Sequence, residues 1–148
     1  MRPVLQALVV ADRVYVDHAT GKKIIAGTFS HFFFIKSGAS PEIHLPNGTK
    51  KRALLGGMQA GSPYGYISLT DVCKGTKLLL QFVNLTTNEV LFGTELSIDS
   101  DDRLQTIEVV APLPSLPITE PGTYALELVW EGEILGFWRI TAAELSLK

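Results

Sequence analysis

Residues 123–141 read TYALELVWEGEILGFWRIT, two apolar runs separated by Glu131-Gly132. Two strand-like runs joined by a two-residue turn that ends in glycine are typical of a β-hairpin. Counting outward from this turn predicts three cross-strand pairs, Trp130–Glu133, Val129–Ile134 and Leu126–Phe137. The stretch therefore indicates an antiparallel sheet that contains the last part of the chain.

Both faces of this expected hairpin are apolar. Alternation along the strands places five residues on one face, Tyr124, Leu126, Leu128, Leu135 and Phe137. It places five others on the opposite face, Ala125, Val129, Ile134, Trp138 and Ile140. The run 22–35 has the same two-sided character, because Phe29 and Phe33 alternate with Phe32 and Phe34.

A second apolar face implies a cover, since an antiparallel strand that faces water normally alternates apolar with polar residues. We therefore predict an interaction surface formed by Phe32, Phe34, Ile134, Trp138 and Ile140. Two covers fit this pattern. One is the glycine- and proline-rich segment 36–63, and the other is a protein partner, including a second copy of the chain.

Strand-like runs also fill the rest of the chain outside segment 36–63. Six further strands are predicted, at residues 4–17, 22–35, 64–72, 77–85, 89–98 and 104–111. Eight strands at regular spacing, with turn residues between them, are typical of a β-sandwich. We predict one all-β domain over residues 1–148, an antiparallel sandwich of about eight strands with an immunoglobulin-like or C2-like arrangement.

The overall composition excludes several classes of protein. Of the 148 residues, 46% are hydrophobic and 19% charged, which is too apolar for a disordered chain. A net charge of −2 argues against a nucleic-acid-binding surface. The single cysteine fits a reducing compartment, and the short apolar run at residues 4–11 reads as a strand rather than a secretory leader. We expect a cytoplasmic protein without a membrane span.

Catalytic and cofactor motifs are not apparent in the sequence. His18, His31 and His44 lack the short spacing of a metal motif, and Cys73 has no neighbouring cysteine. No Gly-x-Ser-x-Gly elbow is present. Asp12 and Asp71 lie within apolar strands, where a carboxylate that ties strands or loops together is the preferred interpretation. We predict no enzyme and no cofactor.

Two weaker candidate sites come from polar loops and aromatic residues. The turn containing Asp99, Asp101 and Asp102 could supply oxygen ligands to calcium, although Asp and Ser also stabilise turns without metal. Tyr64 and Tyr66, beside segment 36–63, could form the rim of a small-ligand or carbohydrate site.

The N-terminal hairpin carries a family resemblance. Residues 11–17, ADRVYVD, followed by residues 20–29, TGKKIIAGTF, are similar to the opening of an uncharacterised bacterial domain family. Residues 69–71 (LTD) and 121–124 (PGTY) are similar to further marks of that family, so the resemblance covers most of the chain. It implies a stand-alone β-sandwich of unknown function and assigns no site residues.

The sequence therefore favours a non-enzymatic protein-interaction or assembly module. The all-β pattern, the missing catalytic motifs and the two-sided apolar strands support this interpretation. A small-ligand or carbohydrate-binding sandwich is the alternative, and a calcium-dependent binding module is a further one.

Overall fold

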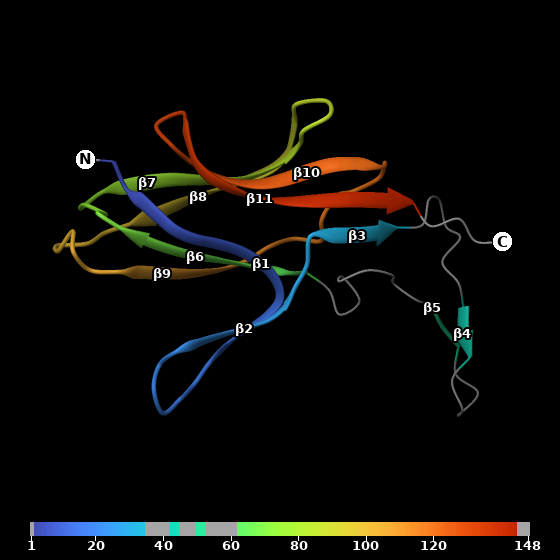
Figure 1. Cartoon of the computed structure of the whole chain (residues 1–148), viewed down its shortest axis with the longest axis horizontal. Coiled ribbons are helices and arrows are strands. Elements are labelled where there is room, and N and C mark those ends of the chain that lie inside the picture. The colour runs from blue at the N-terminus through green and yellow to red at the C-terminus, as the bar shows by residue number, and fades with distance from the viewer. Residues whose placement is uncertain (1, 35–41, 45–49, 53–61, 145–148) are drawn as a thin grey trace.

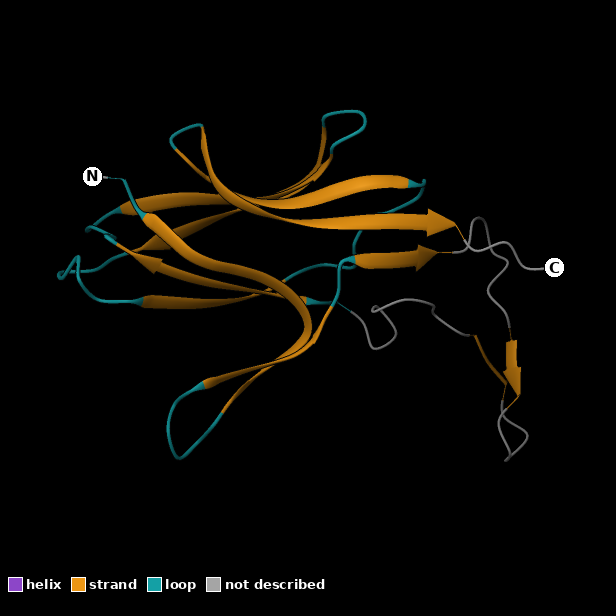
Figure 2. Cartoon of the chain, in the orientation of Figure 1, coloured by secondary structure: helices purple, strands orange, loops and turns teal. Residues whose placement is uncertain are grey.

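The computed structural model describes residues 2–34, 42–44, 50–52 and 62–144 and folds into two packed β-sheets (Figure 1). The strands have these bounds: β1 Val4–Val16, β2 Lys23–Thr28, β3 His31–Phe34, β4 Glu42–His44, β5 Lys50–Arg52, β6 Tyr64–Thr70, β7 Thr76–Asn84, β8 Glu89–Ile98, β9 Ile107–Pro112, β10 Gly122–Trp130 and β11 Glu133–Glu144. Within the described ranges there are strands and loops but no helix (Figure 2). The predicted all-β sandwich is confirmed.

The two sheets have the strand orders β2-β1-β6-β9 and β3-β11-β10-β7-β8, and β4 and β5 form a separate two-stranded sheet. In an immunoglobulin domain, strands A, B and E form one sheet and strands G, F, C and C′ the other. Here β1, β6 and β9 pair in the first pattern, and β11, β10, β7 and β8 in the second. The chain order of these strands matches as well. The structure thus favours the immunoglobulin-like of the two expected arrangements.

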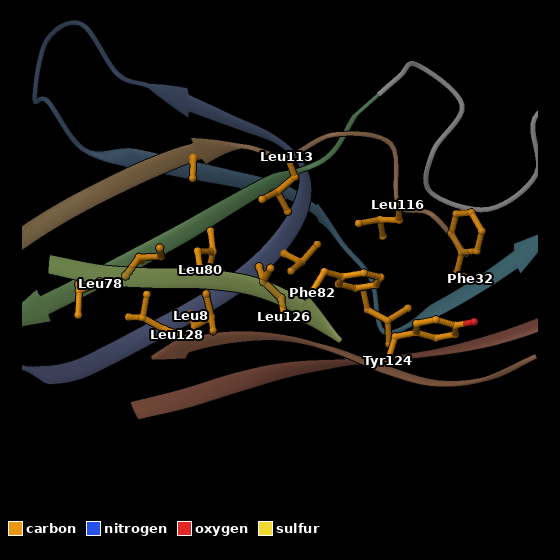
Figure 3. Close-up of a cluster of buried hydrophobic side chains, with 14 of the residues drawn as sticks. Leu8, Phe32, Leu78, Leu80, Phe82, Leu113, Leu116, Tyr124, Leu126 and Leu128 are labelled. Atoms are coloured by element: carbon orange, nitrogen blue, oxygen red, sulfur yellow. The ribbon is translucent and has the colours of Figure 1, made fainter. Parts of the chain in front are cut away.

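An aromatic stack lies at one end of the core between the sheets (Figure 3). The ring of Phe82 stacks on Phe92 with centroids 5.4 Å apart and on Tyr124 at 5.6 Å. The Tyr124 hydroxyl donates a hydrogen bond of 2.7 Å to the carbonyl of Glu120, four residues earlier at the corner before β10. Immunoglobulin-like sandwiches have a tyrosine corner of this kind, which anchors the crossover between the sheets. Burial raises the pKa of Tyr124, and the nearby Glu120 charge adds to the rise.

The predicted strand 22–35 is wrong as a single element, because it is two strands in different sheets. β2 pairs with β1 in the four-stranded sheet, whereas β3 pairs with β11 in the other. Gly27, with a φ of 75°, lets the chain leave the regular strand path just before the crossover. The β3–β11 pairing is parallel, so the sandwich is not purely antiparallel as predicted.

The crossover also changes which side chains reach the core. Phe32 and Phe34 are buried between the sheets, so their assignment to an outer surface was wrong. The indole Nε1 of Trp138 donates a hydrogen bond of 2.9 Å to the carbonyl of Phe29 in the crossover. Trp138 thereby holds the crossover against β11.

A β-bulge changes the last hairpin. The turn Glu131-Gly132 and the pairs Trp130–Glu133 and Val129–Ile134 are as predicted, with both turn residues at positive φ. The register then shifts between Leu128 and Val129, and Leu126 pairs with Trp138 instead of Phe137. One extra residue in β11 reverses the facing of every later side chain in that strand.

Candidate functional site

The predicted interaction surface divides between the core and the outer face of the five-stranded sheet. Ile140 has no exposed area and Trp138 packs against the core, because the bulge turns both of them inward. Phe32 and Phe34 are core residues through the crossover. Of the five predicted residues, only Ile134 lies on the outer face.

The outer face of the five-stranded sheet carries a continuous group of twelve residues, the outer patch. They form three rows across strands β11, β10, β7 and β8. The rows are Arg139–Ala125–Val83–Val90, Phe137–Glu127–Gln81–Gly93 and Ile134–Val129–Leu79–Glu95.

Four large apolar side chains stand out from this patch. Their exposed fractions are 51% for Phe137, 49% for Ile134, 54% for Val90 and 39% for Leu79. Ala125 and Val83 lie between them and are buried, yet they do not belong to the core cluster. Neighbouring apolar side chains on adjacent strands form a contiguous surface, which is a mark of an interaction site rather than of scattered exposure.

Polar groups fix the centre and two corners of the outer patch. Gln81 Nε2 donates a hydrogen bond of 2.9 Å to Glu127 Oε1 at the centre, and the Glu127 side chain is almost fully buried. The guanidinium of Arg139 lies 4.9 Å from the ring centroid of Phe137, a cation–π geometry that holds this ring on the surface. At the opposite corner, Lys77 Nζ lies 3.8 Å from Glu95.

Two bulges shape the outer patch. One lies in the β10–β11 pair, and the other shifts the β7–β8 register between Phe82 and Val83. Because a bulge bends its strand, these pairs curve along their length. The β10–β11 and β7–β8 turns rise from the outer side of the sheet, on either side of the patch (Figure 1). The patch thus lies between two turns that extend on its side of the sheet.

The sequence missed Phe137, Leu79 and Val90 as surface residues. A signal for Phe137 was present, because Arg139 and Thr141 follow it at two-residue intervals and share its face. Arg139 and Thr141 are exposed, as expected for residues on a strand face that contacts water. The polar Gln81 marks the face of Leu79 in the same way.

The two predicted rim tyrosines lie on the outer face of the other sheet, both partly buried on β6. The Tyr66 hydroxyl donates a hydrogen bond to Glu108 on β9, and Lys23 of β2 lies 3.5 Å from the same carboxylate. Burial raises the pKa of Tyr66, and the Glu108 carboxylate adds to the rise. This cluster ties the β1–β2 hairpin to β9. The adjoining segment 36–63 lies mostly outside the described residues.

The acidic turn uses its side chains within the loop. Asp99 accepts a hydrogen bond from the backbone N–H of Gly75, and Asp102 accepts one of 3.0 Å from Leu104 N. Ser100 Oγ donates to the carbonyl of Asp102 at 2.9 Å. Asp101 is exposed. In the part of the chain that the structure describes, no group of three or more His, Cys, Asp or Glu side chains is arranged to hold a metal ion.

The two strand carboxylates have different surroundings. Asp71, at a φ of 58°, accepts a hydrogen bond of 3.2 Å from Arg103, and its backbone N–H bonds to the Arg103 carbonyl. It therefore ties the end of β6 to the β8–β9 loop, as predicted. Asp12 lies against Gly27, where a Cβ would meet Asp12 Oδ2 at 2.8 Å. Its Oδ1 is buried without a hydrogen-bond partner.

Comparison of the chain with protein-family models and with curated protein sequences finds no match. The resemblance to an uncharacterised bacterial family therefore stays a prediction. Over the described residues, no helix has the length and apolar character to cross a membrane.

Proposed function

We propose that this chain is a non-enzymatic protein-interaction or assembly module that binds its partner through the outer patch. The observation that carries the proposal is the exposure of four large apolar side chains on one face of the five-stranded sheet, Phe137 and Ile134 on β11, Leu79 on β7 and Val90 on β8. An apolar surface of this kind costs free energy in water, and association with a protein removes that cost. In this proposal the module works in the cytoplasm, in keeping with its single cysteine.

The patch has the composition of an interface centre. Its apolar side chains surround a buried Glu127–Gln81 hydrogen bond, and its charged groups Arg139 and Glu95 are at the corners. Protein interfaces commonly have charged groups at the rim, and aromatic and arginine side chains are enriched in them. Phe137 with Arg139 stacked on it is therefore the expected energetic anchor.

The alternatives receive less support. At the rim of Tyr64 and Tyr66, the Tyr66 hydroxyl donates to Glu108 and so holds the sheet together without a ligand. In the acidic turn, one carboxylate oxygen of Asp99 and one of Asp102 accept backbone N–H groups, a stabilisation that works without a metal ion.

Photocrosslinking in the native host cell tests the proposal. A photoactivatable phenylalanine analogue replaces Phe137, and a matched control places it at Leu104, which is 75% exposed in the loop before β9. We expect position 137 alone to yield a defined protein adduct. The partner, identified by mass spectrometry and purified, should bind the wild-type chain and lose binding to F137D. Adducts from neither position, or equally from both, would contradict the proposal.

A further inference from the structure

We infer that the partner of the outer patch is a second copy of this chain, placed face to face across a two-fold axis. The axis runs along the diagonal of the patch that joins Ile134 and Val90. This inference rests on the proposed function and names its partner.

The four corners of the outer patch carry the argument. Arg139 and Glu95 occupy diagonally opposite corners, because Arg139 begins the first row on β11 and Glu95 ends the last row on β8. Ile134 and Val90 occupy the other two corners. One diagonal therefore has Arg139 at one end and the Glu95 carboxylate, with Lys77 Nζ 3.8 Å from it, at the other, and the second diagonal is apolar at both ends.

When two copies meet face to face, their two-fold axis lies in the plane of the interface. Each position of one patch then faces the position that lies at the same distance on the other side of the axis in the second copy. With the axis along the Ile134–Val90 diagonal, Arg139 of each copy faces Glu95 of the other, and this contact occurs twice. Ile134 of one copy then faces Ile134 of the other, and Val90 likewise faces Val90. With the axis along the charged diagonal, Arg139 would face Arg139 and Glu95 would face Glu95, which is repulsive.

An axis parallel to the strands is also less favourable. It would place Arg139 against Val90 and Glu95 against Ile134, so that all four charges would be desolvated against apolar groups. The charge pattern thus selects one of the simple two-fold arrangements. In that arrangement the patch is complementary to itself.

The dimensions of the patch fit this geometry. Across the sheet, the four strands are spaced about 4.8 Å apart and span about 14 Å. Along a strand, the first and third rows of the patch are four residues apart, which is also about 14 Å. The chosen diagonal therefore runs at about 45° to the strands, and the strands of the two copies cross at about 90°, a known class of sheet packing.

The size of the patch predicts a weak complex. Including its side chains, the patch covers roughly 400 Å² per copy, or about 800 Å² in total. Interfaces at this low end of the range are typical of transient, concentration-dependent complexes. We therefore expect a monomer–dimer equilibrium rather than a permanent dimer.

Charge reversal tests the axis directly. Sedimentation velocity over a concentration series should show dimerisation of the wild type, and F137D should abolish it while L104D should not. R139E and E95R should each raise the dimer Kd by about tenfold or more, because both corner contacts become repulsive. An equimolar mixture of R139E and E95R should dimerise nearly as well as the wild type, since both contacts in the mixed dimer are attractive.

A second test uses the centre of the patch. The proposed axis passes between Glu127 and Gln81, so the two Glu127 carboxylates of the dimer lie next to each other. E127Q should therefore lower the dimer Kd several-fold by removing like-charge repulsion, whereas E108Q on the other sheet should leave it unchanged.

The outcomes separate the two proposals. A monomer at all concentrations, or a mixture of R139E and E95R that associates no better than either variant alone, overturns the inference. If the photocrosslinked adduct at position 137 is a different protein, the inference fails while the proposed function stands. If position 137 gives no specific adduct, both fail. Thermal melting of each variant checks that it is folded.

Discussion

The bulge in β11 determines which side chains of this strand contribute to the stability of the sandwich, and this can be tested by mutation. In the observed register Ile140 faces the core with no exposed area, whereas Phe137 faces water with 51% of its surface exposed. Uninterrupted pairing from the Glu131-Gly132 turn would give the reverse. Truncating each side chain to alanine therefore distinguishes the two registers.

The expected free energies differ enough to measure. Removing a fully buried isoleucine side chain costs about 2–5 kcal/mol, because a cavity adds to the lost burial. Phe137 has about half of its surface in water, so F137A should lose about half of a full phenylalanine burial, roughly 1–1.5 kcal/mol. In a chain of this size, I140A should lower the Tm by about 2–4 °C for each kcal/mol lost.

Urea denaturation followed by tryptophan fluorescence provides the measurement. The protein concentration is kept low, so that association through the outer patch does not contribute to stability. Equal costs for the two variants, or a larger cost for F137A, would refute the bulged register and with it the outer patch.

Three further predictions concern other contacts. W138F should cost about 1 kcal/mol in urea denaturation, because the Phe29 carbonyl loses its indole donor, and a cost near zero would mean that the bond does not hold the crossover. The free energy of unfolding should fall as the pH rises above about 10. Tyr66 and Tyr124 have raised pKa values and keep their protons in the folded state, whereas the unfolded chain loses them. The Tm measured from pH 8 to 11 should therefore fall less in Y66F/Y124F than in the wild type, and an equal fall of Tm with pH in both proteins would contradict this. G136A should be destabilising because a Cβ at this position meets Leu5 Cδ2 at 2.5 Å. The double variant L5A/G136A should be more stable than the sum of the two single changes implies, because L5A removes the atom that clashes. Additive effects of the two changes would argue against the clash.

Local sequence signals predicted most of the strands well. The predicted 64–72 corresponds to β6 at Tyr64–Thr70, and 89–98 coincides with β8 at Glu89–Ile98. Glu131-Gly132 was identified because its turn geometry depends on adjacent residues alone. Such features can be predicted from the sequence because they depend on interactions between residues that are close together in the chain.

The features that require distant partners were not predictable in this way. The β3–β11 pairing joins residues far apart in the chain, and nothing in 22–35 specifies which sheet each half enters. Beside the bulge in β11, Leu5 of β1 packs closely against Gly136, so the surroundings of the bulge also come from distant residues. The bulge reverses the facing of Trp138 and Ile140, and the crossover carries Phe32 and Phe34 into the core, so only Ile134 of the five predicted surface residues was placed correctly.

The crossover that carries β3 away from β2 has a consequence for folding. The Trp138 side chain bonds to Phe29, 109 residues earlier, and β3 lies along the end of β11. Closing so long a loop is slow, because its entropy is lost before the contacts form. On the ribosome, Phe32 and Phe34 must wait for β11 to emerge, so the nascent chain exposes part of its future core until synthesis has passed Glu144. We expect deletion of the end of β11 to leave β3, with Phe32 and Phe34 exposed, as an aggregation-prone segment.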